Sequence, residues 1–266
     1  MNLPFFWIDA FASRVFAGNP AGVVPLEHWL PDDGLQHIAF ENGLAETAFF
    51  VRTGPDRFHL RWFTPAVEVD LCGHATLATA FTLFTQLGQP GDRVAFDSRS
   101  GPLSVARLAA GWLELDFPAT PTAPESDDAT GRAVAGALGL APTWLGRTRF
   151  DLFAVLPDAE TVRTLRPDLD RVAAAGGRGL IVTAAGGDGA DFVSRFFAPQ
   201  SGVPEDPVTG SSHCALVPYW SEQLGRTRLR ARQVSARGGE LRCEARGDRV
   251  GIAGNAVLYL RGQISV

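Results

Sequence analysis

The feature of this sequence that most constrains its fold is a pattern that occurs twice. The segment RWFTP at 61–65 corresponds to RFFAP at 195–199. Each is followed by an acidic stretch that leads into a glycine-initiated apolar segment, EVDLCGHATLA at 68–78 and PEDPVTGSSHCA at 204–215. The shared order of strand, acidic loop, glycine and helix indicates a duplicated fold with equivalent loops around a pseudo-twofold axis. Because clefts between domains are favoured ligand sites, we expect the two helix starts to face one cleft.

Short apolar and β-branched segments, separated by Gly and Pro, predict strands in both halves of the chain. The gaps between several of these segments are too short for crossover helices, which favours mostly antiparallel connections. The expected strands of the first half lie at 5–11, 46–53, 58–64, 93–98 and 111–118. Those of the second half lie at about 150–156, 179–184 and 191–199.

One apolar helix is expected in each half. The segment 73–88 has apolar residues at helical spacing and no proline, and Gly88 stands where a helix ends. The second helix is expected at 210–224, where Pro218 implies a kink or an early end. Between the halves, the Pro-, Ala- and Asp-rich stretch 118–131 is typical of a linker, and a short helix should follow it.

Composition excludes several kinds of chemistry. The 266 residues include 24 arginines and no lysine, so neither a Walker A phosphate loop nor a lysine Schiff base can form. The net charge of −5 is spread along the chain, and we expect no nucleic-acid partner. Three widely spaced cysteines, Cys72, Cys214 and Cys243, do not form a disulfide framework. With no leader peptide or spanning segment in view, a soluble cytoplasmic protein without a membrane partner is expected.

Other common catalytic motifs are missing from the sequence. The five histidines form no HxxxH or HxH pair, and Cys72 with His74 is only half of a zinc-binding pattern, so no metal site is expected. There is no GxSxG motif of a serine hydrolase and no GxGxxG motif of a dinucleotide-binding fold.

The starts of the two expected helices are candidate binding positions. Gly73 with His74, and Gly210 with Ser211 and Ser212, would present unpaired backbone N–H groups and a partial positive charge. Two such starts suit a small substrate that carries a carboxylate. Glycine and serine are also common helix-start residues without any ligand, and the pattern alone leaves both interpretations open.

Four side chains are candidates for chemistry. Glu46 lies in the apolar run LAETAFF, where a carboxylate suits general acid and base catalysis, although a glutamate at a strand edge is the alternative. The helix dipole should lower the pKa of His74. Asp206, between two prolines, matches a capping or turn aspartate. Cys72 is either a thiol with a lowered pKa at a helix start or a buried inert cysteine.

Four stretches together resemble, in order and spacing, the phenazine-biosynthesis PhzF-like isomerases. They are DAFASRVFAGNPAGVV (9–24), NGLAETAFF (42–50), RWFTPAVEVDLCGHATLATA (61–80) and FFAPQSGVPEDPVTGSSHCAL (196–216). The resemblance implies an α+β, diaminopimelate-epimerase-like fold of two similar domains, each a curved antiparallel sheet wrapped around a central helix. The first domain is then expected to comprise 1–117 plus about 255–266, and the second 118–254, with the active site between them.

The resemblance also assigns roles by position. It implies three catalytic residues, which are Glu46, His74 and Asp206. It implies three positions that hold the substrate carboxylate, which are Gly73, Gly210 and Ser211. The implied reaction needs no cofactor: Glu46 takes a proton from an activated carbon of a small carboxylate and returns it to another carbon of the same conjugated system. A homodimer is expected from the same resemblance.

Other functions stay open at this point. Related epimerases and proline racemases use two facing cysteines, whereas here Cys72 stands near the first position and Thr209 at the second. A two-thiol racemase is therefore disfavoured, but a Cys72-dependent epimerase or dehydratase is not, and neither is a non-catalytic small-molecule-binding protein. The substrate is not identified. Arg14, Arg61 and Arg195 could contact a carboxylate, but pairing with surface acids is expected.

Overall fold

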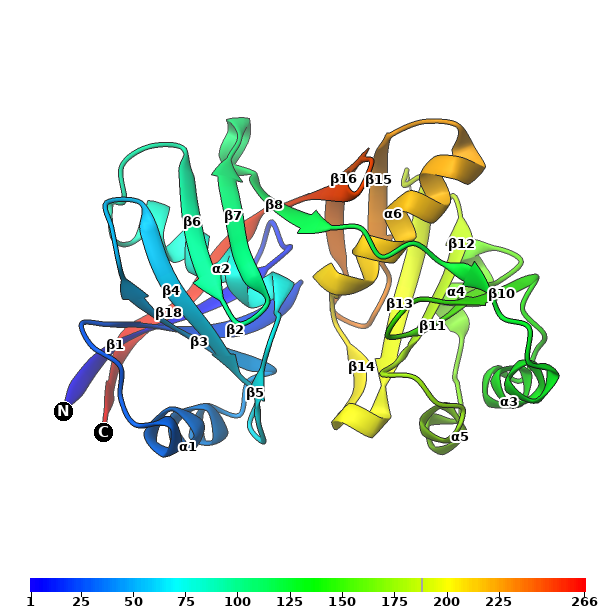
Figure 1. Cartoon of the computed structure of the whole chain (residues 1–266), viewed down its shortest axis with the longest axis horizontal. Helices are drawn as coiled ribbons and strands as arrows, with labels where there is room; N and C mark the ends of the chain where they lie inside the picture. Colours follow the sequence, from blue (N-terminus) through cyan, green and yellow to red (C-terminus); the bar gives the residue numbers. More distant parts are fainter. Residues whose placement is uncertain (188) are drawn as a thin grey trace. The chain divides into compact units, whose positions relative to one another are not determined.

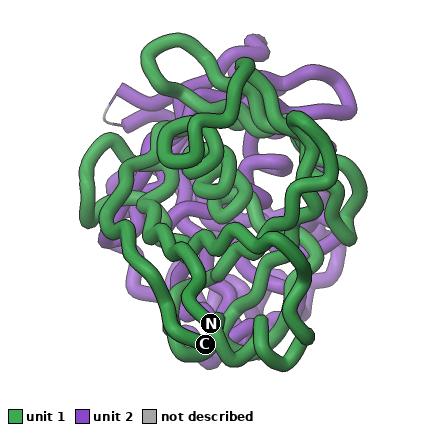
Figure 2. Tube along the Cα trace, turned by 90° about the vertical axis from the view of Figure 1, so that its left-hand side faces the viewer, with its two compact units in different colours: residues 1–117, 252–266 green, residues 118–251 purple. Residues whose placement is uncertain are grey.

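The computed structural model describes residues 1–187 and 189–266 (Figure 1). The chain divides into two compact units, one of residues 1–117 and 252–266 and the other of residues 118–251 (Figure 2). Both chain ends belong to the first unit, where the backbones of Met1 and Val266 are hydrogen-bonded to each other. The architecture is a mixed one in which strands predominate, and helices α1 to α6 accompany them in the described residues.

The first unit, unit 1, is a sheet with one helix inside and one outside. Its elements are β1 (Asn2–Ala10), β2 (Asn19–Leu26), α1 (Asp32–Asn42), β3 (Glu46–Arg52), β4 (Arg57–Phe63), β5 (Glu68–Val69), α2 (Gly73–Thr85), β6 (Arg93–Ser98), β7 (Gly101–Arg107), η1 (Ala109–Gly111), β8 (Leu113–Pro118) and β18 (Ala256–Ser265). The sheet runs β18, β1, β2, β3, β4, β6, β7, β8, with β5 beside β4. The β2–β3 and β4–β6 pairs are parallel and the others antiparallel.

Helix α2 forms the centre of unit 1. It packs against β1, β2, β3, β7 and β18, and 11 of its 13 residues are buried. The helix contains no Asp, Glu, Lys or Arg, and small and apolar residues lie on all its faces, which suits a position in the core. The hydroxyls of Thr76, Thr79 and Thr82 donate to carbonyls four residues earlier, which satisfies these buried polar groups. The helix ends at Thr85, before the expected end, and Gly88 follows with a φ of 66°.

The second unit, unit 2, repeats this plan with more helices outside the sheet. Its elements are β9 (Ala123–Pro124), α3 (Asp128–Leu138), β10 (Trp144–Arg147), β11 (Leu152–Val155), α4 (Ala159–Thr164), α5 (Leu169–Ala174), β12 (Leu180–Ala185), β13 (Phe192–Ala198), η2 (Pro199–Ser201), β14 (Val203–Asp206), α6 (Gly210–Leu224), β15 (Arg228–Gln233) and β16 (Gly239–Arg246), with β17 (Arg249–Gly254) at the division. The sheet runs β9, β10, β11, β12, β13, β15, β16, with β14 beside β13. The β11–β12 and β13–β15 pairs are parallel.

The duplicated pattern of the sequence corresponds to the same strand pairing in both units. In unit 1, β4 pairs antiparallel with β5 and parallel with β6, the strand that follows the central helix α2. In unit 2, β13 pairs antiparallel with β14 and parallel with β15, which follows α6. The repeated segments therefore build equivalent structures.

An arginine–glutamate pair is repeated as well. Arg61 donates to both carboxylate oxygens of Glu68, at 2.7 and 2.8 Å, and Arg195 donates to both oxygens of Glu205, at 2.7 and 2.9 Å. The side chains of the two arginines are only 12% and 7% exposed. The expectation that these two arginines pair with acids at the surface is therefore wrong. Both are largely buried, and each joins a strand to the short strand that follows it, β4 to β5 and β13 to β14. Arg14 is exposed.

One further expectation is corrected by the structure. The segment 118–131 is not simply a linker, since it contains β9, which pairs with β10, and the start of α3. Asp127 caps α3 by accepting hydrogen bonds from Ala129 and Thr130. Helix α6 has the expected range, Gly210–Leu224, and includes Pro218 without ending early there. None of the described helices is long and apolar enough to cross a membrane.

Candidate active site

The strongest cluster of reactive side chains lies in unit 1, around the start of α2. Glu46 is the first residue of β3, and His74 is the second residue of α2. Oε2 of Glu46 lies 3.1 Å from Nε2 of His74, and the two side chains are 18% and 5% exposed. Among the described residues, no group donates a hydrogen bond to the other oxygen, Oε1 of Glu46. Glu46 therefore keeps one carboxylate oxygen available beside a buried imidazole.

The opposite edge of the His74 ring meets two other groups. Its Nδ1 lies 3.2 Å from Nδ2 of Asn19 and 3.5 Å from Sγ of Cys72. When the His74 ring is neutral and the Asn19 amide is the donor, Nδ1 accepts and Nε2 carries the proton that faces Glu46. No sequence motif singled out Asn19, although this residue lies within the stretch 9–24 and directly follows Gly18, whose φ is 66°.

The charges around His74 overturn the expectation drawn from the helix dipole. Burial of the imidazole acts to lower its pKa, but the interactions with Cys72 and Glu46 outweigh burial, and the pKa of His74 is raised. For Cys72, burial comes first and Glu46 adds to it, so the pKa of this thiol is raised. Burial therefore favours the thiol form of Cys72, and the neighbouring Glu46 carboxylate favours the protonated form of His74.

Glu46, Cys72 and His74 also raise the question of a metal site. One ligand atom from each lies within 4.8 Å of the others, a cluster that sequence spacing could not reveal. However, Cys72 faces Nδ1 while Glu46 faces Nε2, and a metal ion binds a histidine through only one of its nitrogens. One of the two contacts would have to break, so the arrangement suits proton transfer better than chelation.

The start of α2 leaves its backbone donors available. Cys72 is the N-cap residue of α2, and its side chain makes no capping hydrogen bond. The N–H groups of Gly73 and His74 are therefore not occupied by a side-chain cap. Gly73 lies next to His74, so the donors and the acid–base pair share one end of the helix.

In unit 2, the predicted site residues gather at the start of α6. Asp206 accepts a hydrogen bond from Oγ1 of Thr209 at 2.5 Å. The buried amide of Gln233, on β15, donates to the backbone oxygen of Asp206 at 2.7 Å and accepts from the backbone N–H of Thr209 at 2.8 Å. Thr209 is the N-cap of α6 without a side-chain capping bond, and Gly210 and Ser211 follow it. The Asp206 turn is thus fixed by Gln233, which sequence reasoning missed.

His213, one turn into α6, has a different role from His74. Its Nδ1 lies 2.8 Å from the carbonyl oxygen of Thr209, and burial lowers its pKa to about 4. The unfolded chain binds this proton near pH 6.5, so stability should fall as the pH drops from about 6.5 to about 4, by up to about 3 kcal/mol. We expect His213→Gln to reduce this dependence in unfolding measurements across that range. An unchanged pH dependence in the variant would contradict the assignment.

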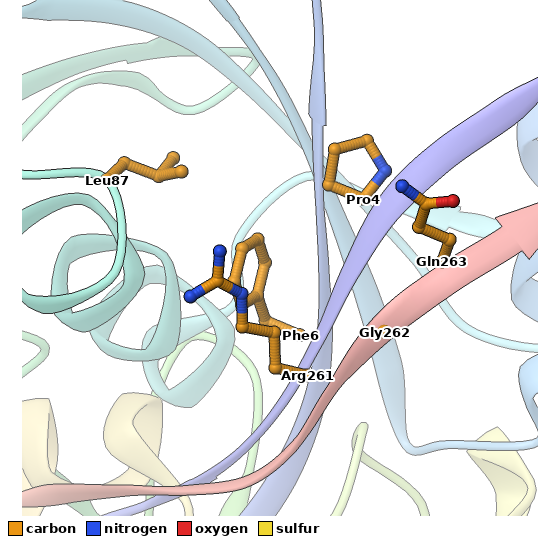
Figure 3. A pocket seen from close by; sticks show the side chains of 6 residues that line it. All are labelled: Pro4, Phe6, Leu87, Arg261, Gly262 and Gln263. Carbon is orange, nitrogen blue, oxygen red and sulfur yellow. The ribbon is translucent and has the colours of Figure 1, made fainter.

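Unit 1 also contains a pocket whose lining shares no residue with the Glu46–His74 cluster. Figure 3 shows its lining residues, which are Pro4, Phe6, Leu87, Arg261, Gly262 and Gln263. The Arg261 guanidinium lies over the Phe6 ring, 5.9 Å from its centre. The lining includes no carboxylate, imidazole or thiol, and none of the predicted site residues. The pocket is therefore not a candidate for acid–base chemistry.

Comparisons with known proteins show which family and which solved structures the chain is similar to. Residues 8–262 match the family described as phenazine biosynthesis-like protein. An uncharacterized isomerase of Pseudomonas aeruginosa is 51% identical over 99% of both chains. A crystal structure of a PhzF-family phenazine biosynthesis protein from Enterococcus faecalis is 46% identical, covers 100% of both chains and gives a TM-score of 0.93. A hydroxyproline epimerase from Agrobacterium vitis, with bound trans-4-hydroxy-L-proline, shares the fold at 10% identity over 99% of this chain and 92% of its own, with a TM-score of 0.66.

Proposed function

The chain belongs to the phenazine biosynthesis-like family of isomerases, as its sequence resemblance predicts, and we propose that Glu46 moves a proton within a small carboxylate substrate. The observation that carries this proposal is the contact of 3.1 Å between the Glu46 carboxylate and the buried His74 imidazole. A carboxylate with one available oxygen, in a partly buried position, suits both removal and return of a proton.

The proposed reaction balances without any external oxidant or reductant. Glu46 takes a proton from an activated carbon, so that the C–H bond breaks, an O–H bond forms and the electron pair spreads over the conjugated system. The O–H bond then breaks, and the proton returns to a different carbon of that system. The His74 side chain, in contact with Glu46, stabilises the carboxylate and the negative charge that develops on the substrate. Asp206 would orient the substrate and relay protons.

The two units correspond, in this proposal, to the two domains of a diaminopimelate-epimerase-like fold. Each domain would be a curved sheet wrapped around its central helix, one comprising 1–117 plus about 255–266 and the other 118–254. The substrate carboxylate would be held by the helix starts of both, through Gly73, Gly210 and Ser211. As in the sequence-based expectation, the enzyme would act as a homodimer and need no cofactor.

A Cys72-dependent epimerase or dehydratase is the second candidate. Its support is the distance of 3.5 Å between Sγ of Cys72 and Nδ1 of His74, and the fold is shared with the hydroxyproline epimerase of Agrobacterium vitis. One observation weighs against it. The pKa of the Cys72 thiol is raised, first by burial and further by the nearby Glu46 carboxylate, so the thiolate that would act as the base is disfavoured.

Incubation with two kinds of probe in deuterium oxide, followed by proton NMR, separates the candidates. The probes are a panel of cyclohexadiene carboxylates and trans-4-hydroxy-L-proline. The proposed isomerase should shift a double bond in at least one diene and leave hydroxyproline unchanged. Deuterium at the α-carbon of hydroxyproline would instead identify an epimerase. Binding without exchange into any probe would identify a non-catalytic binding protein and contradict the proposal.

Replacing Cys72 with serine tests the same distinction on the protein. We expect Cys72→Ser to keep turnover within about threefold of the wild type, because the base is Glu46 and the thiol only contacts the imidazole. Cys214→Ser is a matched control, since Cys214 is also buried and its pKa is raised to about 12 by burial. Steady-state kinetics on the active diene is the measurement. A loss of 100-fold or more in Cys72→Ser alone would favour the thiol-dependent candidate.

A further inference from the structure

An arginine next to the predicted substrate position Ser211 is held in an unusually fixed loop. Arg178 lies in the GGRG segment between α5 and β12. Gly177 has a φ of 75°, and a Cβ on Gly179 would lie 2.4 Å from the Phe196 ring. The backbone N–H of Arg178 also donates to the carbonyl of Phe150 at 2.7 Å. Only glycine fits both flanking positions, and the backbone of this loop therefore holds the Cα atom of Arg178 in a defined position.

The guanidinium of Arg178 is held as firmly as its backbone. Its Nε and Nη2 donate to the two carboxylate oxygens of Asp151 at 2.9 and 2.7 Å, and the Asp151 side chain is only 4% exposed. The guanidinium lies over the rings of Phe150 and Phe196, at 5.5 and 5.7 Å from their centres. A planar guanidinium with this many fixed contacts is preorganised for geometric recognition.

Two hydrogen-bond donors, Nη1 of Arg178 and the hydroxyl of Ser211, are available to a ligand. Nη2 of Arg178 also donates to Oγ of Ser211 at 3.2 Å, which directs the Ser211 hydroxyl proton to another acceptor. Among residues 1–187 and 189–266, no group accepts a hydrogen bond from Nη1 of Arg178. The Arg178 side chain is 41% exposed, so Nη1 is accessible. A planar anion could accept from Nη1 and from Ser211 at the same time.

We propose that Arg178 is a specificity-determining residue that, together with Ser211, binds the carboxylate of the substrate. The inference rests on the proposed function, in which Ser211 contacts that carboxylate. It favours carboxylates over the corresponding amides and esters, because a guanidinium attracts an anionic planar acceptor more strongly than a neutral carbonyl. Asp151 acts as a positioning residue that holds the guanidinium in place.

Calorimetric titration with benzoate and with benzamide tests this role, because the two probes share shape and differ in charge. Wild type should bind benzoate at least tenfold more tightly than benzamide. Arg178→Gln should weaken benzoate binding about tenfold or more and leave benzamide binding unchanged. Arg178→Lys, which keeps the charge beside Asp151 and protects folding, should fall between them. Arg226→Gln is the matched control, since Arg226 also pairs with an aspartate, Asp191, on the surface.

These measurements test the role of Arg178 in carboxylate binding separately from the role of Glu46 as the base. Equal affinities of wild type for the two probes, or unchanged benzoate binding in both Arg178 variants, would overturn the role of Arg178. On an active diene carboxylate, the Arg178 variants should raise KM more than they lower kcat. Glu46→Gln should bind benzoate like wild type but lose turnover. An active Glu46→Gln with benzoate-deficient Arg178 variants would overturn the proposed base alone and support the carboxylate site.

Discussion

Glu46→Gln is expected to lower turnover by about 10³-fold, within the range of about 10² to 10⁴ typical of a lost general acid or base. Glutamine has nearly the same shape as glutamate, but its amide cannot take a proton from carbon. The variant also removes the negative charge 3.1 Å from the imidazole of His74, so the pKa of His74 should fall. Steady-state kinetics and titration of the His74 ring by NMR measure the two effects.

Glu41→Gln is the matched control for this variant, because Glu41 is an exposed glutamate on α1. It should keep the turnover of the wild type. Thermal unfolding of both variants shows whether the fold is retained. A folded Glu46→Gln enzyme with at least a tenth of wild-type turnover would remove Glu46 from the role of base.

Arg195→Ala is expected to destabilise the protein by about 3 to 5 kcal/mol, the usual effect of breaking a buried ion pair. The Arg195 guanidinium donates to both oxygens of Glu205 and, within unit 2, to the carbonyls of Val162 at 3.2 Å and Leu165 at 2.7 Å. It also lies over the ring of Phe197. Alanine would leave Glu205 without its partner and the two carbonyls without this donor.

Urea unfolding is the measurement for Arg195→Ala, with Arg228→Ala as its control. Arg228 also pairs with a glutamate, Glu244, but its side chain is 84% exposed and its removal should change stability little. A similar, small effect of both substitutions would contradict the view that the buried Arg195–Glu205 pair stabilises unit 2.

The sequence predicted those elements whose determinants are local. Both central helices begin where expected, at Gly73 and Gly210, because an apolar run directly follows a glycine. The strand at 93–98 has the predicted ends, since Gly and Asp flank a β-branched and aromatic core. The internal match also predicted equivalent structures. These features depend on residues that are close together in the sequence, so the sequence alone predicts them.

The site could be predicted only in part, because its geometry depends on strand pairing. Glu46 and His74 were expected from resemblance, but Asn19 meets His74 only because α2 packs against β2. Gln233 reaches the Asp206 turn because β15 pairs with β13. The pKa of His74 was expected to fall because the helix dipole was considered without the carboxylate opposite. Such long-range contacts leave no local signal in the sequence.

The central claim is that Glu46, and not Cys72, moves the proton. The most direct test is deuterium exchange from solvent into an active diene carboxylate, followed by NMR for wild type, Glu46→Gln and Cys72→Ser under identical conditions. Wild type and Cys72→Ser should both exchange and shift the double bond, while folded Glu46→Gln should do neither above about a thousandth of the wild-type rate. Full exchange by Glu46→Gln together with loss of exchange in Cys72→Ser would contradict the claim.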